Sequence, residues 1–251
     1  TAQQIFTNFK NVVDSTSRTL PFGIAQMGKA FRNEITLKSF IFRVREFEQM
    51  EMQYFVKPGT DNEAFGQWKD KRLNFYLDNL DINKDKLRFH EHGSNELAHY
   101  AKEAWDIEYK FPFGWSEIEG IHNRTDYDLS RHEEFSGKNL SYFDQPNNDR
   151  YLPYIIETSA GLNRMLLTVL ADAYWEDDKN NRTVMRISPR LAPVKAVICH
   201  LLKKDGLPEK AREIVEILKP HFKVLYDQQG SIGKRYYRQD EAGTPFGITV
   251  D

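Results

Sequence analysis

Apolar residues recur along this chain with helical spacing in some segments and with strand spacing in others, which predicts a mixture of helices and strands. The first helix is expected over about residues 4–15, where the apolar positions follow helical spacing: Ile5, Phe9, Val12 and Val13. Pro21 ends this helix. Residues 24–55 then predict two strands joined by a polar turn at 36–39, with the second strand beginning at about Phe40.

The middle of the chain alternates between the two spacings. The predicted elements, in order, are an amphipathic helix at 63–80, a short strand at 87–92, a helix capped by Asn95 that runs to Asp106, a strand around 116–121, an irregular polar loop or lid at 130–150, a strand from Tyr154 that ends at a glycine turn, and an apolar helix at 165–174. On the strand around 116–121, Glu117 and Glu119 lie two positions apart, so both are expected to face one side.

The last part of the chain has a regular order of short apolar and amphipathic segments. After a charged linker or loop at 177–181, the predicted elements are strands at 194–202, 222–226 and 246–250, separated by helices at 208–218 and 231–241. Strands that alternate with helices are typical of a parallel sheet covered by helices. We therefore expect a separate α/β unit that begins at residue 190.

Composition places the 251 residues among water-soluble globular proteins, with 40% hydrophobic and 29% charged residues. We find no apolar run of membrane-spanning length and no signal-like start, and the one cysteine, Cys199, is expected to be buried. A reducing, cytoplasmic compartment is the expectation. His90 and His92 lack a nearby third ligand, which disfavours a metal site. The net charge of −2 divides into −5 for residues 1–189 and +3 for residues 190–251.

Residues 31–55 hold the densest group of candidate functional side chains. Arg32 and Glu34 are two positions apart and would share a strand face. The second predicted strand would place on one face Arg43, Arg45, Phe47, Gln49 and Glu51. A guanidinium fork suits phosphate oxygens, and a phenylalanine ring offers a flat face to a base. The alternative is a solvated hairpin with cross-strand ion pairs.

Two segments resemble the signature motifs of class II aminoacyl-tRNA synthetases. Phe31-Arg32-Asn33-Glu34, a loop and Arg43-Val44-Arg45-Glu46-Phe47 resemble the second motif, and the run at 43–51 is similar to glycyl-tRNA synthetases of the dimeric type. The segment at 154–164, which ends in Gly161-Leu162-Asn163-Arg164, resembles the third motif. Thr158 and Asn163 depart from a proline and an aspartate that are common in the family.

The resemblance implies a division of roles among these residues. Arg32, Arg43 and Arg164 would be catalytic through contacts with the phosphates of ATP, and the full set of ATP-binding residues would be Arg32, Asn33, Glu34, Phe42, Arg43, Val44, Arg45, Glu46, Phe47, Glu117, Ile118, Gly161, Leu162, Asn163 and Arg164. Glu117 would also be a ligand of Mg²⁺. Glycine would be bound by Phe47, Glu48, Gln49, Met50, Glu51, Glu157, Thr158, Ser159, Ala160 and Gly161.

The last unit resembles the anticodon-binding domain shared by class IIa synthetases, with the match carried by residues 230–241 and 243–246. Three basic side chains interleaved with Tyr236 and Tyr237 would contact the tRNA: Lys234, Arg235 and Arg238. A solvated basic helix end is the alternative.

The resemblance also implies fold, function and partners. We expect an α+β catalytic domain built on an antiparallel sheet with helices at 1–189, lacking its N-terminal motif, followed by an α/β anticodon-binding domain at 190–251 that is incomplete at its C-terminal end. The expected activity is that of a homodimeric, cytoplasmic glycine–tRNA ligase that uses ATP, Mg²⁺, glycine and tRNA(Gly). The alternatives are a non-catalytic relative, such as a polymerase accessory subunit, and a class IIa synthetase for threonine, proline or histidine.

Overall fold

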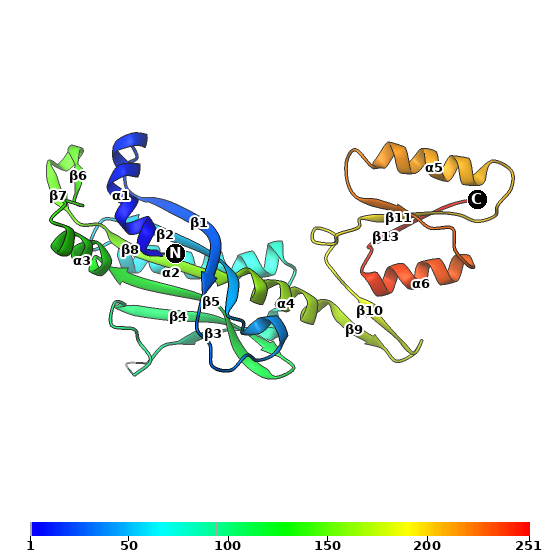
Figure 1. The fold of residues 1–251 in the computed structure, drawn as a ribbon, viewed down its shortest axis with the longest axis horizontal. Helices are drawn as coiled ribbons and strands as arrows, with labels where there is room; N and C mark the ends of the chain where they lie inside the picture. The colour runs from blue at the N-terminus through cyan, green and yellow to red at the C-terminus, as the bar shows by residue number, and fades with distance from the viewer. Residues whose placement is uncertain (1, 94) are drawn as a thin grey trace. The chain divides into compact units, whose positions relative to one another are not determined.

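The computed structural model describes residues 2–93 and 95–251, and the chain divides into two compact units. Unit 1 runs to Leu77 and from Asn83 to Thr168, and unit 2 comprises Asp78–Ile82 and Val169–Asp251. Figure 1 shows the antiparallel sheet of the first unit and the smaller α/β arrangement of the second. No helix in the described part of the chain is long and apolar enough to span a membrane.

Unit 1 is organised around a six-stranded antiparallel sheet with the order β1-β2-β8-β5-β4-β3. Its strands are β1 (Phe22–Phe31), β2 (Glu46–Val56), β3 (Leu87–Glu91), β4 (Glu103–Phe111), β5 (Gly114–Thr125) and β8 (Tyr154–Gly161). The helix α4 (Leu162–Ala173) follows β8 directly. This arrangement confirms the predicted α+β class for the first part of the chain.

Helices pack on both faces of this sheet because consecutive residues of a strand point to opposite sides. Phe55 joins a core with α1 (Ala2–Thr16) and α3 (Tyr127–Ser136), and its ring centroid lies 4.5 Å from that of Phe9. The preceding residue, Tyr54, contacts Trp68 of α2 (Asp61–Asn74) at a centroid distance of 5.3 Å. A π-helical turn at Phe75–Asn79 continues α2.

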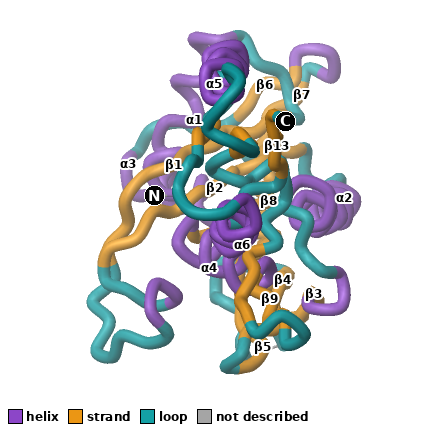
Figure 2. The backbone as a smooth tube through the Cα atoms, turned by 90° about the vertical axis from the view of Figure 1, so that its right-hand side faces the viewer, coloured by secondary structure: helices purple, strands orange, loops and turns teal. Residues whose placement is uncertain are grey.

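The connection between β1 and β2 differs from the predicted hairpin. The second strand begins at Glu46, whereas the sequence predicted a start near Phe40. A short 3₁₀ turn occupies Phe40–Phe42, and both Ser39 and Phe40 have positive φ angles, of 53° and 56°. A strand cannot continue through that backbone conformation. The arginines expected on strand faces, Arg32, Arg43 and Arg45, therefore lie in a loop, which Figure 2 shows as the segment between the two strands.

Two other predictions were wrong in the middle of unit 1. The helix expected after Asn95 is absent, and β4 begins at Glu103 because the neighbouring backbone joins the sheet; the amide of Lys102 donates to the Asn123 carbonyl oxygen at 2.8 Å. The segment expected to be an irregular loop at 130–150 instead continues α3 and forms the hairpin β6 (Tyr142–Asp144) and β7 (Asp149–Tyr151). Burial of Leu140 and Tyr142 against α1 accounts for this order.

Unit 2 contains the predicted parallel sheet, with the order β12-β11-β13. Its elements are β11 (Ala196–His200), α5 (Leu207–Leu218), β12 (Val224–Tyr226), α6 (Ile232–Ala242) and β13 (Phe246–Val250). The central strand β11 is buried along its whole length, and Cys199 is 1% exposed, as expected. The charged segment at 177–181, predicted as a linker or loop, is the turn of an antiparallel hairpin, β9 (Tyr174–Asp177) and β10 (Arg182–Met185).

Candidate active site

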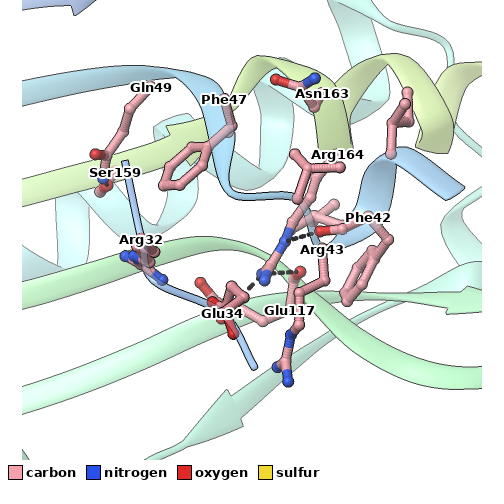
Figure 3. A pocket seen from close by; sticks show the side chains of 14 residues that line it. Arg32, Glu34, Phe42, Arg43, Phe47, Gln49, Glu117, Ser159, Asn163 and Arg164 are labelled. Carbon is pink, nitrogen blue, oxygen red and sulfur yellow. Dashed lines mark hydrogen bonds and ion pairs between the residues drawn. The ribbon is translucent and has the colours of Figure 1, made fainter. Parts of the chain in front are cut away.

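A pocket opens in unit 1, where the β1–β2 loop meets β5, the end of β8 and the start of α4. Figure 3 shows side chains from all these segments converging on it. The lining residues are Arg32, Glu34, Ile41, Phe42, Arg43, Val44, Phe47, Gln49, Glu117, Ile118, Ser159, Gly161, Asn163 and Arg164. Eleven of the fifteen predicted ATP-binding residues are among them; the others are Asn33, Arg45, Glu46 and Leu162.

Three guanidinium groups reach this pocket, two from the β1–β2 loop and one from α4. Arg32 and Arg43 lie on the β1–β2 loop, and both are exposed. Within residues 2–93 and 95–251, neither guanidinium forms an ion pair with a carboxylate. Arg164, at the start of α4, is held more firmly, since its Nη1 donates to the Glu117 carbonyl oxygen at 2.9 Å and its Nε to that of Phe42 at 3.2 Å. The pocket therefore combines two uncompensated positive charges with one that is fixed in place.

Aromatic rings flank the arginines. The Arg164 guanidinium lies over the Phe42 ring at 4.3 Å from its centroid, and Phe111 and Phe113 contact the same ring edge-on at 5.4 and 5.3 Å. Phe47, the second residue of β2, lines the pocket, and the Arg32 guanidinium lies 5.4 Å from its centroid. Arg164 and Phe47 thus offer two flat groups to the pocket, and both are labelled in Figure 3.

Glu117 and Glu119 do not share a face, which corrects the prediction made from their spacing. A β-bulge interrupts β5, so that Glu117 pairs with Glu108 while Glu119 pairs with Ile107. The half-exposed Glu117 carboxylate lines the pocket and lies 3.1 Å from Nη1 of Arg164. Glu119 is buried under α2, where its carboxylate accepts two hydrogen bonds from Arg72, at 2.5 and 3.0 Å.

The predicted glycine-binding residues divide between the two faces of the sheet. Gln49 and Ser159 line the pocket, and the Gln49 side-chain amide donates to the Ser159 hydroxyl at 2.9 Å. Glu51 on β2 and Glu157 on β8 are the next residues on this face of the sheet, and both carboxylates are buried. The alternate residues point to the opposite face, so only their backbone can contribute: Glu48, Met50, Thr158 and Ala160.

Glu157 is the centre of a buried ionic cluster. It accepts a hydrogen bond from the Gln53 side-chain amide at 2.7 Å, and Nη1 of Arg124 lies 3.3 Å from both its oxygens. Arg124 also donates to both oxygens of Asp128, at 2.8 and 3.0 Å. Burial alone would raise the pKa of Glu157, but His122 and Arg124 outweigh it and hold that pKa below its ordinary value. Glu157 is therefore an ionised carboxylate at neutral pH.

Sequence reasoning missed part of this arrangement. Ile41 lines the pocket from the 3₁₀ turn, and the predicted strand gave no reason to select it. Arg124 was not among the predicted site residues, because its contact with Glu157 joins positions 33 apart on neighbouring strands. A buried arginine with two carboxylate partners has no local sequence signal.

The basic residues predicted to bind RNA occupy different environments on α6. Lys234 is exposed. Arg238 is also exposed, and its Nη2 lies 2.7 Å from the Asp227 carboxylate. Arg235 is 5% exposed and donates to the carbonyl oxygens of His200 and Gly230, at 2.6 and 2.9 Å. The burial of Arg235 makes it a structural residue and corrects its prediction as a phosphate contact.

Comparison with known proteins gives matches over both units. A family model described as the tRNA synthetase class II core domain (G, H, P, S and T) matches residues 1–173, and one described as an anticodon binding domain matches residues 195–251. The predicted domain boundary at 189/190 falls between the two matches and stays a prediction. A solved prolyl-tRNA synthetase of Giardia lamblia, in complex with prolyl-adenylate, is similar in fold, with a TM-score of 0.74 and 19% identity over 100% of this chain and 49% of its own.

Curated relatives are much closer in sequence. A glycine–tRNA ligase of Treponema denticola is 58% identical over 100% of this chain and 57% of its own length, and that of Borrelia hermsii is 57% identical over 100% and 58%. This chain thus spans little more than half the length of these relatives. Since the core-domain model covers well over half of the residues, the chain belongs to the class II tRNA synthetase family.

Proposed function

We propose that this protein is a glycine–tRNA ligase, which activates glycine with ATP to form glycyl-adenylate and transfers glycine to the 3′ end of tRNA(Gly). The observation that carries the proposal is the convergence of Arg32, Arg43 and Arg164 on one pocket beside Phe47. Relatives that bear the name glycine–tRNA ligase, at 54–58% identity, support the choice of amino acid. We further propose a cytoplasmic homodimer, as the family resemblance implies.

The arginines suit a reaction in which negative charge moves between phosphate groups. Arg32 would hold the α-phosphate, where the glycine carboxylate attacks, and Arg43 the departing phosphates. Adenine would lie between the Phe47 ring and the guanidinium of Arg164, whose bonds to two carbonyl oxygens fix its plane. Catalysis would then consist of alignment and charge stabilisation, with no covalent intermediate on the enzyme.

The pocket also suits a magnesium ion that arrives with ATP. Mg²⁺ is commonly bound by one or two carboxylates together with substrate phosphates. Glu117 and Glu34 both line the pocket, and the Glu117 carboxylate is half-exposed, so these residues fit such an ion. Within the described residues, no group of three or more His, Cys, Asp or Glu side chains forms a metal site of its own. When bound, the ion would neutralise phosphate charge.

Glycine would bind next to the nucleotide, along the same faces of β2 and β8. Its ammonium group needs negative charge, which Glu51 and Glu157 provide from adjacent strands. The side chain of Ser159 and the backbone up to Gly161 would fill the space that a Cβ requires. Exclusion by filled space is strong, because a larger amino acid must overlap protein atoms.

The proposal is tested by ATP–pyrophosphate exchange with each of the twenty amino acids. We expect exchange that depends on glycine and that is at least a hundredfold weaker with alanine or serine, because an added side chain has no room. Exchange with no amino acid would favour a non-catalytic relative. Preference for threonine, proline or histidine would assign a different class IIa enzyme.

A second prediction separates the roles of the two units. Lys234→Ala and Arg238→Ala should each weaken tRNA binding and lower the slope of log K against log salt by about 1, as expected for one lost phosphate contact. Glycine-dependent exchange should not change, since it requires no tRNA. The measurement is tRNA affinity at several salt concentrations. Lys210→Ala is a matched control, because it removes one exposed basic side chain of the same unit from α5, outside the predicted tRNA-contacting helix α6. Lost exchange with unchanged tRNA affinity would contradict the assigned roles.

A further inference from the structure

A row of imidazole and carboxylate groups crosses the sheet of unit 1 beside Glu157. Nε2 of His92 lies 2.8 Å from a carboxylate oxygen of Asp106, on β4. His122, on β5, is the direct cross-strand neighbour of Glu157 on β8, and its Nδ1 lies 3.3 Å from Oε1 of Glu157. His122 therefore lies against the Glu157 carboxylate, and its ring centroid is 6.3 Å from that of His92, the partner of Asp106.

The backbone leaves the space that this histidine needs. A Cβ atom on Gly120 would lie only 2.7 Å from Cε1 of His122 and 3.5 Å from Oδ1 of Asp106. Gly120 is also the cross-strand partner of Asp106. Its φ angle is not in the left-handed region, so the lack of a side chain at this position serves the packing of the imidazole and not a turn.

The position of His122 completes the surroundings of Glu157. Gln53 and Arg124 contact this carboxylate from β2 and from further along β5. Nδ1 of His122 is buried and, within the described residues, forms no hydrogen bond; its contact with Glu157 is the ion pair at 3.3 Å. We propose that His122 is a positioning residue, which fixes the rotamer of Glu157 so that its carboxylate faces the ammonium group of the amino-acid substrate. This inference rests on the proposed function, in which Glu157 binds glycine.

Four substitutions test the proposal in glycine-dependent exchange. His122→Phe keeps an aromatic ring, slightly larger than the imidazole, and removes the ring nitrogens. We expect it to raise the KM for glycine about tenfold with the KM for ATP within twofold. His122→Asn places its amide nitrogen at the position of Nδ1 and should restore the KM for glycine to within about threefold of wild type. His122→Gln carries the same donor on a longer side chain, near the position of Nε2, and should not restore it. Gly120→Ala should raise the KM for glycine by displacing the imidazole.

The control is His90→Phe, which changes an imidazole on the same sheet whose side chain is 40% exposed and lies 3.5 Å from Glu96. His90→Phe should leave the KM for glycine and the KM for ATP unchanged. A merely structural role of His122 predicts instead that His122→Phe is closer to wild type than His122→Asn and that the KM values for glycine and ATP change together. That result, or an unchanged or lower KM for glycine in His122→Phe, overturns the proposal. If His122→Phe does not fold, the difference in the KM for glycine between His122→Asn and His122→Gln decides. Absence of glycine-dependent exchange in the wild type would refute the proposed function itself.

Discussion

Arg32→Ala should lower the rate of glycine-dependent ATP–pyrophosphate exchange by a hundredfold or more. The guanidinium is one of two in the pocket that no carboxylate neutralises within residues 2–93 and 95–251. It lies beside Phe47, where the proposed function places adenine and the adjoining α-phosphate. Removing one preorganised charge-assisted contact to a transition state costs about 3 kcal/mol or more, which corresponds to a factor of about 150 in rate.

The fork geometry of Arg32 can be separated from its charge. Arg32→Lys keeps the charge but offers a point contact in place of two aligned donors, so we expect an intermediate loss. Arg88→Ala serves as a control, because Arg88 is exposed on β3 and pairs with Glu108 at 2.6 Å, outside the pocket. Exchange at near wild-type rates in Arg32→Ala would refute the assignment of this residue.

Arg124→Ala should destabilise unit 1 by about 3–5 kcal/mol, as is typical when one member of a buried ionic cluster is removed. Arg124 is 5% exposed, donates to both oxygens of Asp128, and lies over the Tyr100 ring at 3.8 Å. Its loss leaves Asp128 and Glu157 buried with their main positive partner gone. Arg131→Ala is the matched control, since Arg131 forms an exposed pair with Glu134 at 2.7 Å and should change stability by less than about 1 kcal/mol.

The effect of Arg124→Ala should depend on pH in a defined direction. In the wild type, the pKa of Glu157 is held below its ordinary value, so this group contributes stability above that ordinary value and loses it as the pH falls. Without Arg124, burial raises the pKa of Glu157, and protonation relieves the buried charge. The stability difference between wild type and variant should therefore be largest near pH 7 and narrow below about pH 5. Denaturant unfolding followed by tryptophan fluorescence measures it. A stability difference between wild type and Arg124→Ala that is the same near pH 7 as below about pH 5 would contradict this account.

The sequence by itself determined most elements whose cause is local. The alternation of apolar segments and helices after residue 194 predicted the parallel sheet of unit 2, because strands buried on both faces read as continuous apolar runs. The glycine turn after Ser159 likewise predicted a strand that leads directly into α4. The motif residues predicted most of the pocket lining, because each motif belongs to one continuous segment of chain.

Tertiary contacts decided the rest. The helix predicted from Asn95 to Asp106 is absent. The chain joins the sheet from Glu103 instead, where Glu103 pairs with Asn123 and the Lys102 amide donates to the Asn123 carbonyl oxygen. The sequence predicts Arg235 as an RNA contact on its helix. In the structure it is buried, because its guanidinium donates to the carbonyl oxygens of His200 and Gly230. Glu117 and Glu119 separate to opposite faces through a bulge that depends on pairing with β4. In each case the structure depends on a contact with a residue that is distant in the sequence or lies in irregular backbone. Neither periodicity nor residue type predicts such a contact.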